Sequence, residues 1–250
     1  MLYIVGNGPS RKDFDLEKVH AYGCEWYGCN GIYTEAVPDL LFVHDIPVQH
    51  AAFEAGVYKD MPIAVGDWNP MEIELYEDMK FMHETMPVRV IENRSEDDTH
   101  FVVQGEGEEV YLTSYNSSLG DNIIMYNYDK LKNTFCGIYA LGYAVHHGHK
   151  KICLAGYDSL QFGDLQNIYG PDDCYTYNEV YTEENSGVGR PQQAQFVALL
   201  EHINKDYPDV ELYFKNPIDG FDRIDYNDII SRFNIEDKWV LGTACFESEL

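Results

Sequence analysis

Basic residues are scarce in this chain of 250 residues: 17 lysines and arginines stand against 43 aspartates and glutamates. The formal net charge at pH 7 is therefore −26. Nonspecific binding to DNA or RNA needs a basic surface, so we expect no nucleic-acid partner. A solvated acidic surface is the simplest explanation of the excess, and it leaves room for one local basic pocket.

Long hydrophobic runs and paired cysteine motifs are also missing. No stretch approaches the ~20 apolar residues that a membrane-spanning helix needs, and no basic signal-peptide segment precedes the first apolar run. The six cysteines form no Cys-x-x-Cys pair, and several lie in apolar segments. Buried free thiols in a reducing compartment fit this pattern, so we predict a cytoplasmic protein without a membrane span.

The most informative segment that is present is Gly6-Asn7-Gly8-Pro9-Ser10. It follows an apolar run that predicts a strand and precedes residues Arg11–Val19, which predict a helix with Ser10 as its N-cap and Asp13 three residues on. A strand, a glycine turn and a helix together present backbone N–H groups to an anion, usually a phosphate. The spacing matches neither a dinucleotide fingerprint nor a P-loop, so a phosphate loop and a plain capped turn both stay open.

Strand-like and helix-like segments alternate along the chain. This pattern predicts an α/β fold with a largely parallel sheet and helices on both faces. A hairpin is expected near residues 101–113, where two apolar runs flank Gln104–Glu109. The expected strands are Leu2–Val5, Glu25–Cys29, Leu40–His44, Pro62–Val65, Val88–Ile91, Lys151–Ala155 and Val210–Phe214. The expected helices are Arg11–Val19, Thr134–His147 with Gly148 as its C-cap, Pro191–Lys205 and Tyr226–Phe233.

Polar residues recur just after the predicted strands. Ligands bind outside the carboxyl ends of the strands in open α/β sheets, so such residues are candidates for a binding site. Loops are polar in any case, so each residue alone is weak support, whereas five at one edge are stronger. They are Asn7, Asn30, Asp45, Asp158 and Asn216.

Two further segments have a functional and a structural interpretation. Residues 159–190 are rich in Tyr, Asp, Asn and Gly, and we favour a substrate lid over a disordered loop because tyrosines suit sugars and bases. His146, His147 and His149 surround the predicted end of a helix. Cationic side chains are favourable there, so we prefer that role to a metal site, for which no second ligand cluster is evident.

Several motifs occur in an order that resembles a known family. They are Gly6 to Ser10 with Lys12 and Asp15, Cys29-Asn30 with Tyr33, and Gly137-Ile138-Tyr139 with the strand Lys151 to Asp158. The chain resembles the bacterial sialyltransferases of glycosyltransferase family 42 and a wider group that includes archaeal hydroxymethylpterin diphosphokinase-like proteins. The motifs cover roughly half of the chain, and Ile46 to Lys132 is not matched.

The resemblance implies a single Rossmann-like domain over residues 1–250, with a lid above a nucleotide-sugar site. It implies a CMP- or UDP-linked donor, a glycan or small acceptor, and transfer without a metal held by an Asp-x-Asp motif. Asp13-Phe14-Asp15 fits that motif formally, but its place in the predicted first helix favours a cap. The implied donor-binding residues are Gly6, Asn7, Gly8, Ser10, Asn30, Gly137 and Gly156.

The sequence departs from the family pattern in its catalytic residues. Cys136 replaces a serine, Leu160 replaces a tyrosine, and the lid offers Arg190 where the family has a histidine base. Arginine is a poor base but a good phosphate clamp. We therefore predict Arg190 and Tyr169 as phosphate clamps, and Asp45 or Asp158 as the general base.

Three functions stay open at this point. The first is a glycosyltransferase. The second is a diphosphokinase-like enzyme, in which carboxylates such as Asp45 and Asp158 would hold Mg²⁺. The third is a nucleotide- or sugar-binding protein that has lost its base. The sequence leaves the oligomeric state open.

Overall fold

The computed structural model of the protein describes fourteen stretches of the chain. They are residues 1–12, 14–21, 23–44, 48–49, 51–52, 55–66, 68–71, 88–95, 98–105, 113–116, 123–126, 136–158, 189–215 and 221–228.

The fold is built on an eight-stranded sheet with the strand order β12-β11-β10-β1-β2-β3-β4-β9. Every neighbouring pair is parallel except β11 and β12, which are antiparallel. The predicted Rossmann-like α/β class is therefore confirmed. The strands are β1 (Leu2–Val5), β2 (Trp26–Cys29), β3 (Leu40–Val43), β4 (Ile63–Gly66), β9 (Ile123–Tyr126), β10 (Lys151–Ala155), β11 (Glu211–Lys215) and β12 (Phe221–Arg223).

The direction of winding reverses at β1. The chain moves outward from β1 through β2, β3 and β4, and later returns to place β10 on the other side of β1. Val5, the last residue of β1, pairs with Ala155, the last residue of β10. The carboxyl ends of these two strands therefore lie side by side at the point where open α/β sheets bind their ligands.

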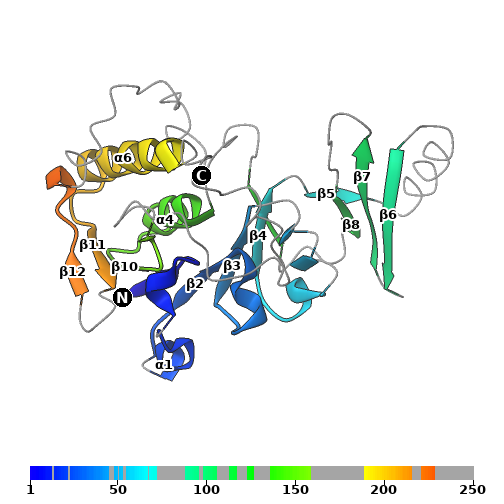
Figure 1. Ribbon diagram of the computed structural model, residues 1–250, viewed down its shortest axis with the longest axis horizontal. Coiled ribbons are helices and arrows are strands. Elements are labelled where there is room, and N and C mark those ends of the chain that lie inside the picture. Colours follow the sequence, from blue (N-terminus) through cyan, green and yellow to red (C-terminus); the bar gives the residue numbers. More distant parts are fainter. Residues whose placement is uncertain are drawn as a thin grey trace.

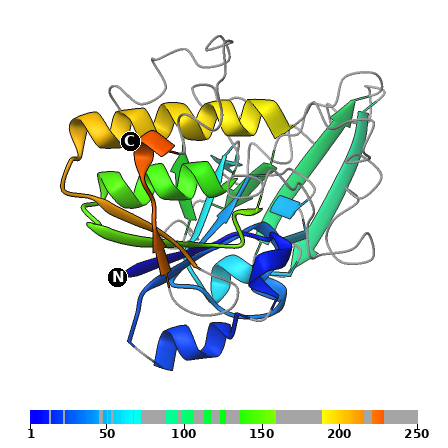
Figure 2. The same cartoon turned by 60° about the vertical axis from the view of Figure 1, so that its left-hand side comes forward.

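Helices cover both faces of the sheet, as the sequence predicted. Helices α4 (Cys136–His146) and α6 (Gly189–Asp206) lie on one face, and α1 (Leu16–Ala21) lies on the other (Figures 1 and 2). Alternate residues of β1 enter the two cores: Ile4 packs with the α4 and α6 side, and Val5 packs with the α1 side. A strand that is buried on both faces has no polar side, which explains the continuous apolar runs. None of the described helices combines the length and apolar character that a bilayer crossing requires.

The predicted helix over Arg11–Val19 is wrong at its start. The chain after β1 makes a short 3₁₀ helix, η1 (Pro9–Arg11), and α1 begins only at Leu16. The N-cap of η1 is Gly8, so the prediction of Ser10 as the N-cap is also wrong. Proline has a fixed φ and no N–H to leave unsatisfied, so it suits the first helical position and starts the turn one residue before Ser10.

The two long helices were predicted more accurately. Helix α4 ends at His146, and Gly148 follows it with a φ of +88°, the left-handed conformation that glycine adopts most easily. Helix α6 starts at Gly189, so Pro191 lies in its first turn, where its missing N–H costs no hydrogen bond. Two more 3₁₀ helices add buried residues to the core on the α1 side: η2 (Asn30–Thr34) directly follows β2, and η3 (Val57–Lys59) precedes β4.

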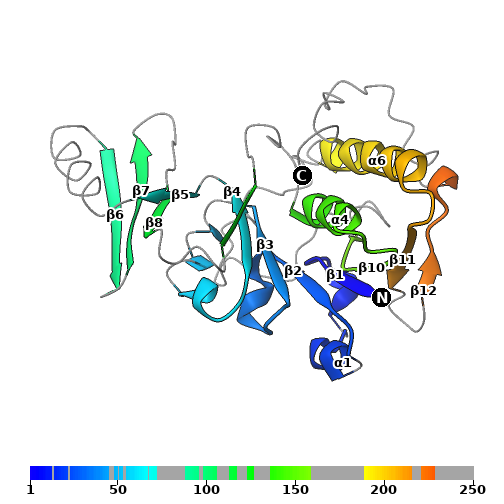
Figure 3. The same cartoon turned by 180° about the vertical axis from the view of Figure 1, so that it is seen from behind.

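The structure has an antiparallel hairpin that begins earlier in the chain than the one predicted near residues 101–113, which stays a prediction. Strands β6 (Val88–Ser95) and β7 (Asp98–Gly105) pair antiparallel along their whole length, from Val88 opposite Gly105 to Ser95 opposite Asp98. Phe101–Val103 belongs to β7, whereas Val110–Leu112 lies outside the described residues. The polar run after Ile91 concealed the second half of β6. Figure 3 shows the hairpin at the β4 end of the sheet, beside the parallel pair β5 (Trp68–Met71) and β8 (Thr113–Asn116).

Candidate functional site at the carboxyl edge of the sheet

The loops that follow β1 and β10 close tightly on each other. The Gly6 N–H donates to the Ala155 carbonyl at 2.8 Å, and the Gly8 N–H donates to the Gly156 carbonyl at 2.9 Å. A Cβ on Gly6 would lie 2.8 Å from the Gly156 oxygen, and a Cβ on Gly156 would lie 2.7 Å from the Gly6 oxygen. These glycines are therefore required by the contact between two loops of the protein itself, whether or not a ligand is bound.

Asp158 fastens this contact with its carboxylate. The Ser10 backbone N–H donates to Oδ1 at 3.0 Å, and the Ser10 hydroxyl donates to Oδ2 at 2.7 Å. The Asp158 residue is only 5% exposed, and a Cβ on Gly8 would overlap its Oδ2. Both carboxylate oxygens are thus engaged inside the protein, which favours a structural role for Asp158 over the predicted role of general base.

Asn7 and Asn30 tie neighbouring strand ends together. The Asn7 side-chain amide donates to the Cys29 carbonyl at 3.1 Å, across the ends of β1 and β2. Asn30 has a φ of +50°, and its side-chain oxygen accepts the His44 backbone N–H at 3.1 Å. Asparagine tolerates left-handed backbone better than most residues do, which explains its presence at this position. Asn7 and Asn30 therefore lie on the same edge, as predicted.

The first turn of α4 lies at the same edge. The Cys136 thiol donates to the Phe42 carbonyl at 2.9 Å, and the Tyr157 hydroxyl donates to the Gly137 carbonyl at 2.8 Å. A Cβ on Gly137 would lie 2.8 Å from the Tyr157 hydroxyl oxygen, so glycine is required for this close approach. Burial, with the neighbouring thiols, raises the pKa of the Tyr157 phenol, so this group stays protonated and can donate.

Sequence reasoning overlooked two charged or titratable groups at this edge. Arg11 is only 2% exposed, and its guanidinium binds the Glu35 carboxylate with two hydrogen bonds, at 3.0 and 3.2 Å. His44, which follows β3, has its pKa lowered to about 4 by burial, so its ring is neutral at pH 7. An arginine in a polar segment is by default a solvated residue, so the sequence carried no signal of its burial.

Of the other predicted site residues, the structure places Arg190 and Asp15, and the rest lie outside the described residues. Arg190 is the second residue of α6. Asp15 of the Asp-x-Asp motif pairs with Lys18 at 2.9 Å on the surface, while Asp13 is outside the described residues. Also outside them are Asp45, Tyr169, Asn216, Leu160 and the lid residues 159–188. Their predicted roles stay predictions.

The histidines near the end of α4 have protein partners. The Nδ1 atom of His147 lies 2.8 Å from the Tyr143 carbonyl oxygen, and the two rings stack at 3.8 Å. The Nε2 atom of His149 lies 3.1 Å from the Tyr27 hydroxyl oxygen. Within the described ranges, no three His, Cys, Asp or Glu side chains are grouped as metal ligands would be. These contacts support the structural interpretation of the cluster.

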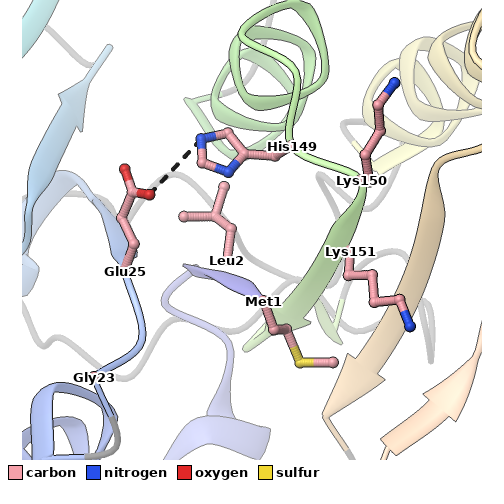
Figure 4. Close-up of a pocket in the computed structure, with 7 residues that line it drawn as sticks. All are labelled: Met1, Leu2, Gly23, Glu25, His149, Lys150 and Lys151. Carbon is pink, nitrogen blue, oxygen red and sulfur yellow. Dashed lines mark ion pairs between the residues drawn. The ribbon is translucent and has the colours of Figure 1, made fainter.

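A hollow of about 430 Å³ lies at the opposite edge, at the amino ends of β1, β2 and β10. Figure 4 shows Glu25 and His149 facing each other across it, with Nε2 3.9 Å from the carboxylate oxygen. Lys150 and Lys151 line the rim, and their ammonium groups pair outward with Asp209 and Glu211 at 2.8 and 3.3 Å. Because these cations already have carboxylate partners, this hollow is a weaker candidate for an anionic ligand than the carboxyl edge.

Comparison with known proteins identifies no relative of this chain. No family model, curated protein or solved structure matches the chain. The geometry at the carboxyl edge and the sequence motifs described above are therefore what support a function.

Proposed function

We propose that the protein transfers a sugar from a CMP- or UDP-linked donor to a glycan or small acceptor, and that it binds the donor at the carboxyl edge of the sheet. One observation supports this proposal most strongly. Three segments that the family resemblance assigns to the donor site, around Asn7, Asn30 and Gly137, converge there although the chain separates them widely. They meet beside the point where the winding reverses.

The chemistry of this edge suits a phosphate-linked donor. The first turn of α4 begins there, and the positive end of a helix dipole favours anions. The hydrogen bonds of Asn7 and Asn30 hold the surrounding backbone in place before a ligand arrives, which lowers the ordering cost of binding. The proposed donor contacts are therefore Asn7, Asn30 and the α4 first turn at Gly137.

The proposed reaction is a displacement at the anomeric carbon. The acceptor hydroxyl oxygen forms a bond to that carbon, and the bond from the carbon to the phosphate oxygen breaks. The phosphate leaves with the electron pair, and the hydroxyl proton passes to a general base. Asp45 is the proposed base, because Asp158 is engaged with Ser10. Tyr169 and Arg190 are proposed to stabilise the charge on the departing phosphate.

Thermal denaturation with a panel of nucleotides tests donor binding. Cytidine and uridine nucleotides and their sugar conjugates are added to the full chain at millimolar concentration, with ATP plus Mg²⁺ as the comparison. A ligand at 100 times its Kd stabilises by about 2.7 kcal/mol, which predicts a rise in Tm of about 5–10 °C. The Asn7→Ala variant should lose most of this rise. The matched control Asn204→Ala, at an exposed position on α6, should keep it.

The outcomes separate the three functions. Absence of stabilisation by any pyrimidine nucleotide would overturn the proposal, and turnover of ATP that requires Mg²⁺ would favour a diphosphokinase-like enzyme instead. If a nucleotide sugar binds, release of free sugar or transfer to an acceptor is then measured for the wild type and for Asp45→Asn. Binding without turnover by the wild type would indicate a binding protein.

A further inference from the structure

The geometry around Ser10 is that of an occupied anion site. A backbone N–H and a hydroxyl, both from Ser10, converge on one carboxylate within 3.0 Å. They follow the first strand of a doubly wound sheet, in the loop that contains Gly6 and Gly8, where such proteins present donors to a phosphate. Here the acceptor is Asp158, which comes from the neighbouring strand end and is almost fully buried.

The surrounding contacts leave no room for a second anion at this point. A Cβ on Gly8 would overlap the Asp158 carboxylate, and the Gly8 N–H is used by the Gly156 carbonyl at 2.9 Å. Arg11, the nearest buried cation in sequence, binds the Glu35 carboxylate with both terminal nitrogens. The donors of the loop and its cation are therefore engaged by groups of the protein itself.

We propose that Asp158 is an internal anion, a positioning residue that occupies the place at the β1 loop where a ligand phosphate would otherwise bind. It fixes Ser10 and Gly8 on the β10 side. Asn7, between Gly6 and Gly8, is thereby held with its amide toward β2. The ligand phosphate then binds on the side of Asn7, Asn30 and α4. This last step rests on the proposed function, whereas the role of Asp158 does not.

Removal of the carboxylate tests the role of Asp158 directly. The Asp158→Ala variant leaves two donors facing an empty space, and small anions should refill it. We expect the Tm of this variant to fall by about 5–10 °C, because two charge-assisted hydrogen bonds are lost. Formate or inorganic phosphate at ten times its Kd should restore about 3–5 °C. In the wild type, the same salts should change the Tm by less than about 1 °C relative to chloride at matched ionic strength, because an anion that does not bind adds no stability by ligand linkage.

Two control variants separate refilling from general salt effects. Asp209→Ala removes an exposed carboxylate that pairs with Lys150 at the opposite edge, and its Tm should not respond to formate. Ser10→Ala, combined with Asp158→Ala, removes one of the two donors and should weaken the apparent formate affinity at least threefold. Equal responses in Asp209→Ala and Asp158→Ala would overturn the proposal.

The isosteric variant Asp158→Asn keeps the test decisive if Asp158→Ala does not fold without an added anion. Its amide still fills the space, so it should fold with a lowered Tm and gain nothing from formate or phosphate. Stabilisation of the wild type by phosphate that disappears in Ser10→Ala would overturn the proposal, because it would show that the loop binds phosphate with Asp158 present. No nucleotide is used in these measurements, so their failure and a failure of nucleotide binding are distinct results.

Discussion

Replacement of Gly156 by alanine should be far more damaging than its position in a surface loop suggests. The residue has a φ of +69°, and a Cβ there would lie 2.7 Å from the Gly6 oxygen and 3.2 Å from Cγ of Arg11. The left-handed conformation costs alanine about 1 kcal/mol more than glycine. The overlap with Gly6 must also separate the two loops, which weakens the hydrogen bonds to the Ala155 and Gly156 carbonyls by about 0.5–1.5 kcal/mol each. The expected loss is about 3 kcal/mol.

Gly23 provides a matched control. Its φ of +65° is nearly the same, but a Cβ there would meet nothing within 4 Å. Gly23→Ala should therefore cost only the conformational part, about 1 kcal/mol. Equilibrium unfolding in urea, followed by circular dichroism, measures both variants against the wild type. Equal losses in the two variants would refute the conclusion that contact between the β1 and β10 loops requires glycine at position 156.

Three further predictions concern the same edge of the sheet. Burial lowers the pKa of His44 from 6.5 in the unfolded chain to about 4 in the folded protein, so the unfolded state binds the proton first and stability falls as the pH drops from 6.5 to 4. The variant His44→Gln should remove about 2–3 kcal/mol of that loss, measured by urea titrations at several pH values. An unchanged pH dependence in this variant would contradict the prediction. By the same assay, Glu35→Ala should cost about 3 kcal/mol of stability, because it leaves the buried Arg11 cation without its carboxylate partner. Arg11→Met should cost only about 1 kcal/mol, because the Glu35 carboxylate that remains can be hydrated. The reverse order would show that the unpaired arginine is not the costly charge. Tyr157→Phe should cost about 1 kcal/mol of folding stability at pH 7, because it loses the hydrogen bond to the Gly137 carbonyl. It should also reduce the decline of stability above pH 10, because the pKa of this phenol is raised in the folded protein and the unfolded state therefore loses its proton first. A variant as stable as the wild type at pH 7 would refute the contribution of this hydrogen bond.

Much of the sheet could be predicted because its central strands are short, apolar and bounded by turn residues. Leu2–Val5 and Lys151–Ala155 have the predicted bounds, and both are buried on two faces. Strand β9 was missed, since its four residues pair with β4, which lies far away in sequence. A strand of that length has no periodicity to read, and its partner is known only when the sheet forms.

The candidate site, like the sheet, could be predicted only in part. Sequence patterns show which polar residues and glycines follow strands, and so predicted the edge at which Asn7, Asn30 and Gly156 lie, whereas Gly137 in α4 was assigned to it only by the family resemblance. The atoms that those groups contact became known from the fold. Ser10 binds Asp158, which is 148 positions away along the chain, and Arg11 is buried against Glu35. Local patterning reports which face of an element is apolar, whereas the partner of a hydrogen-bonding group depends on which loops the strand order brings together.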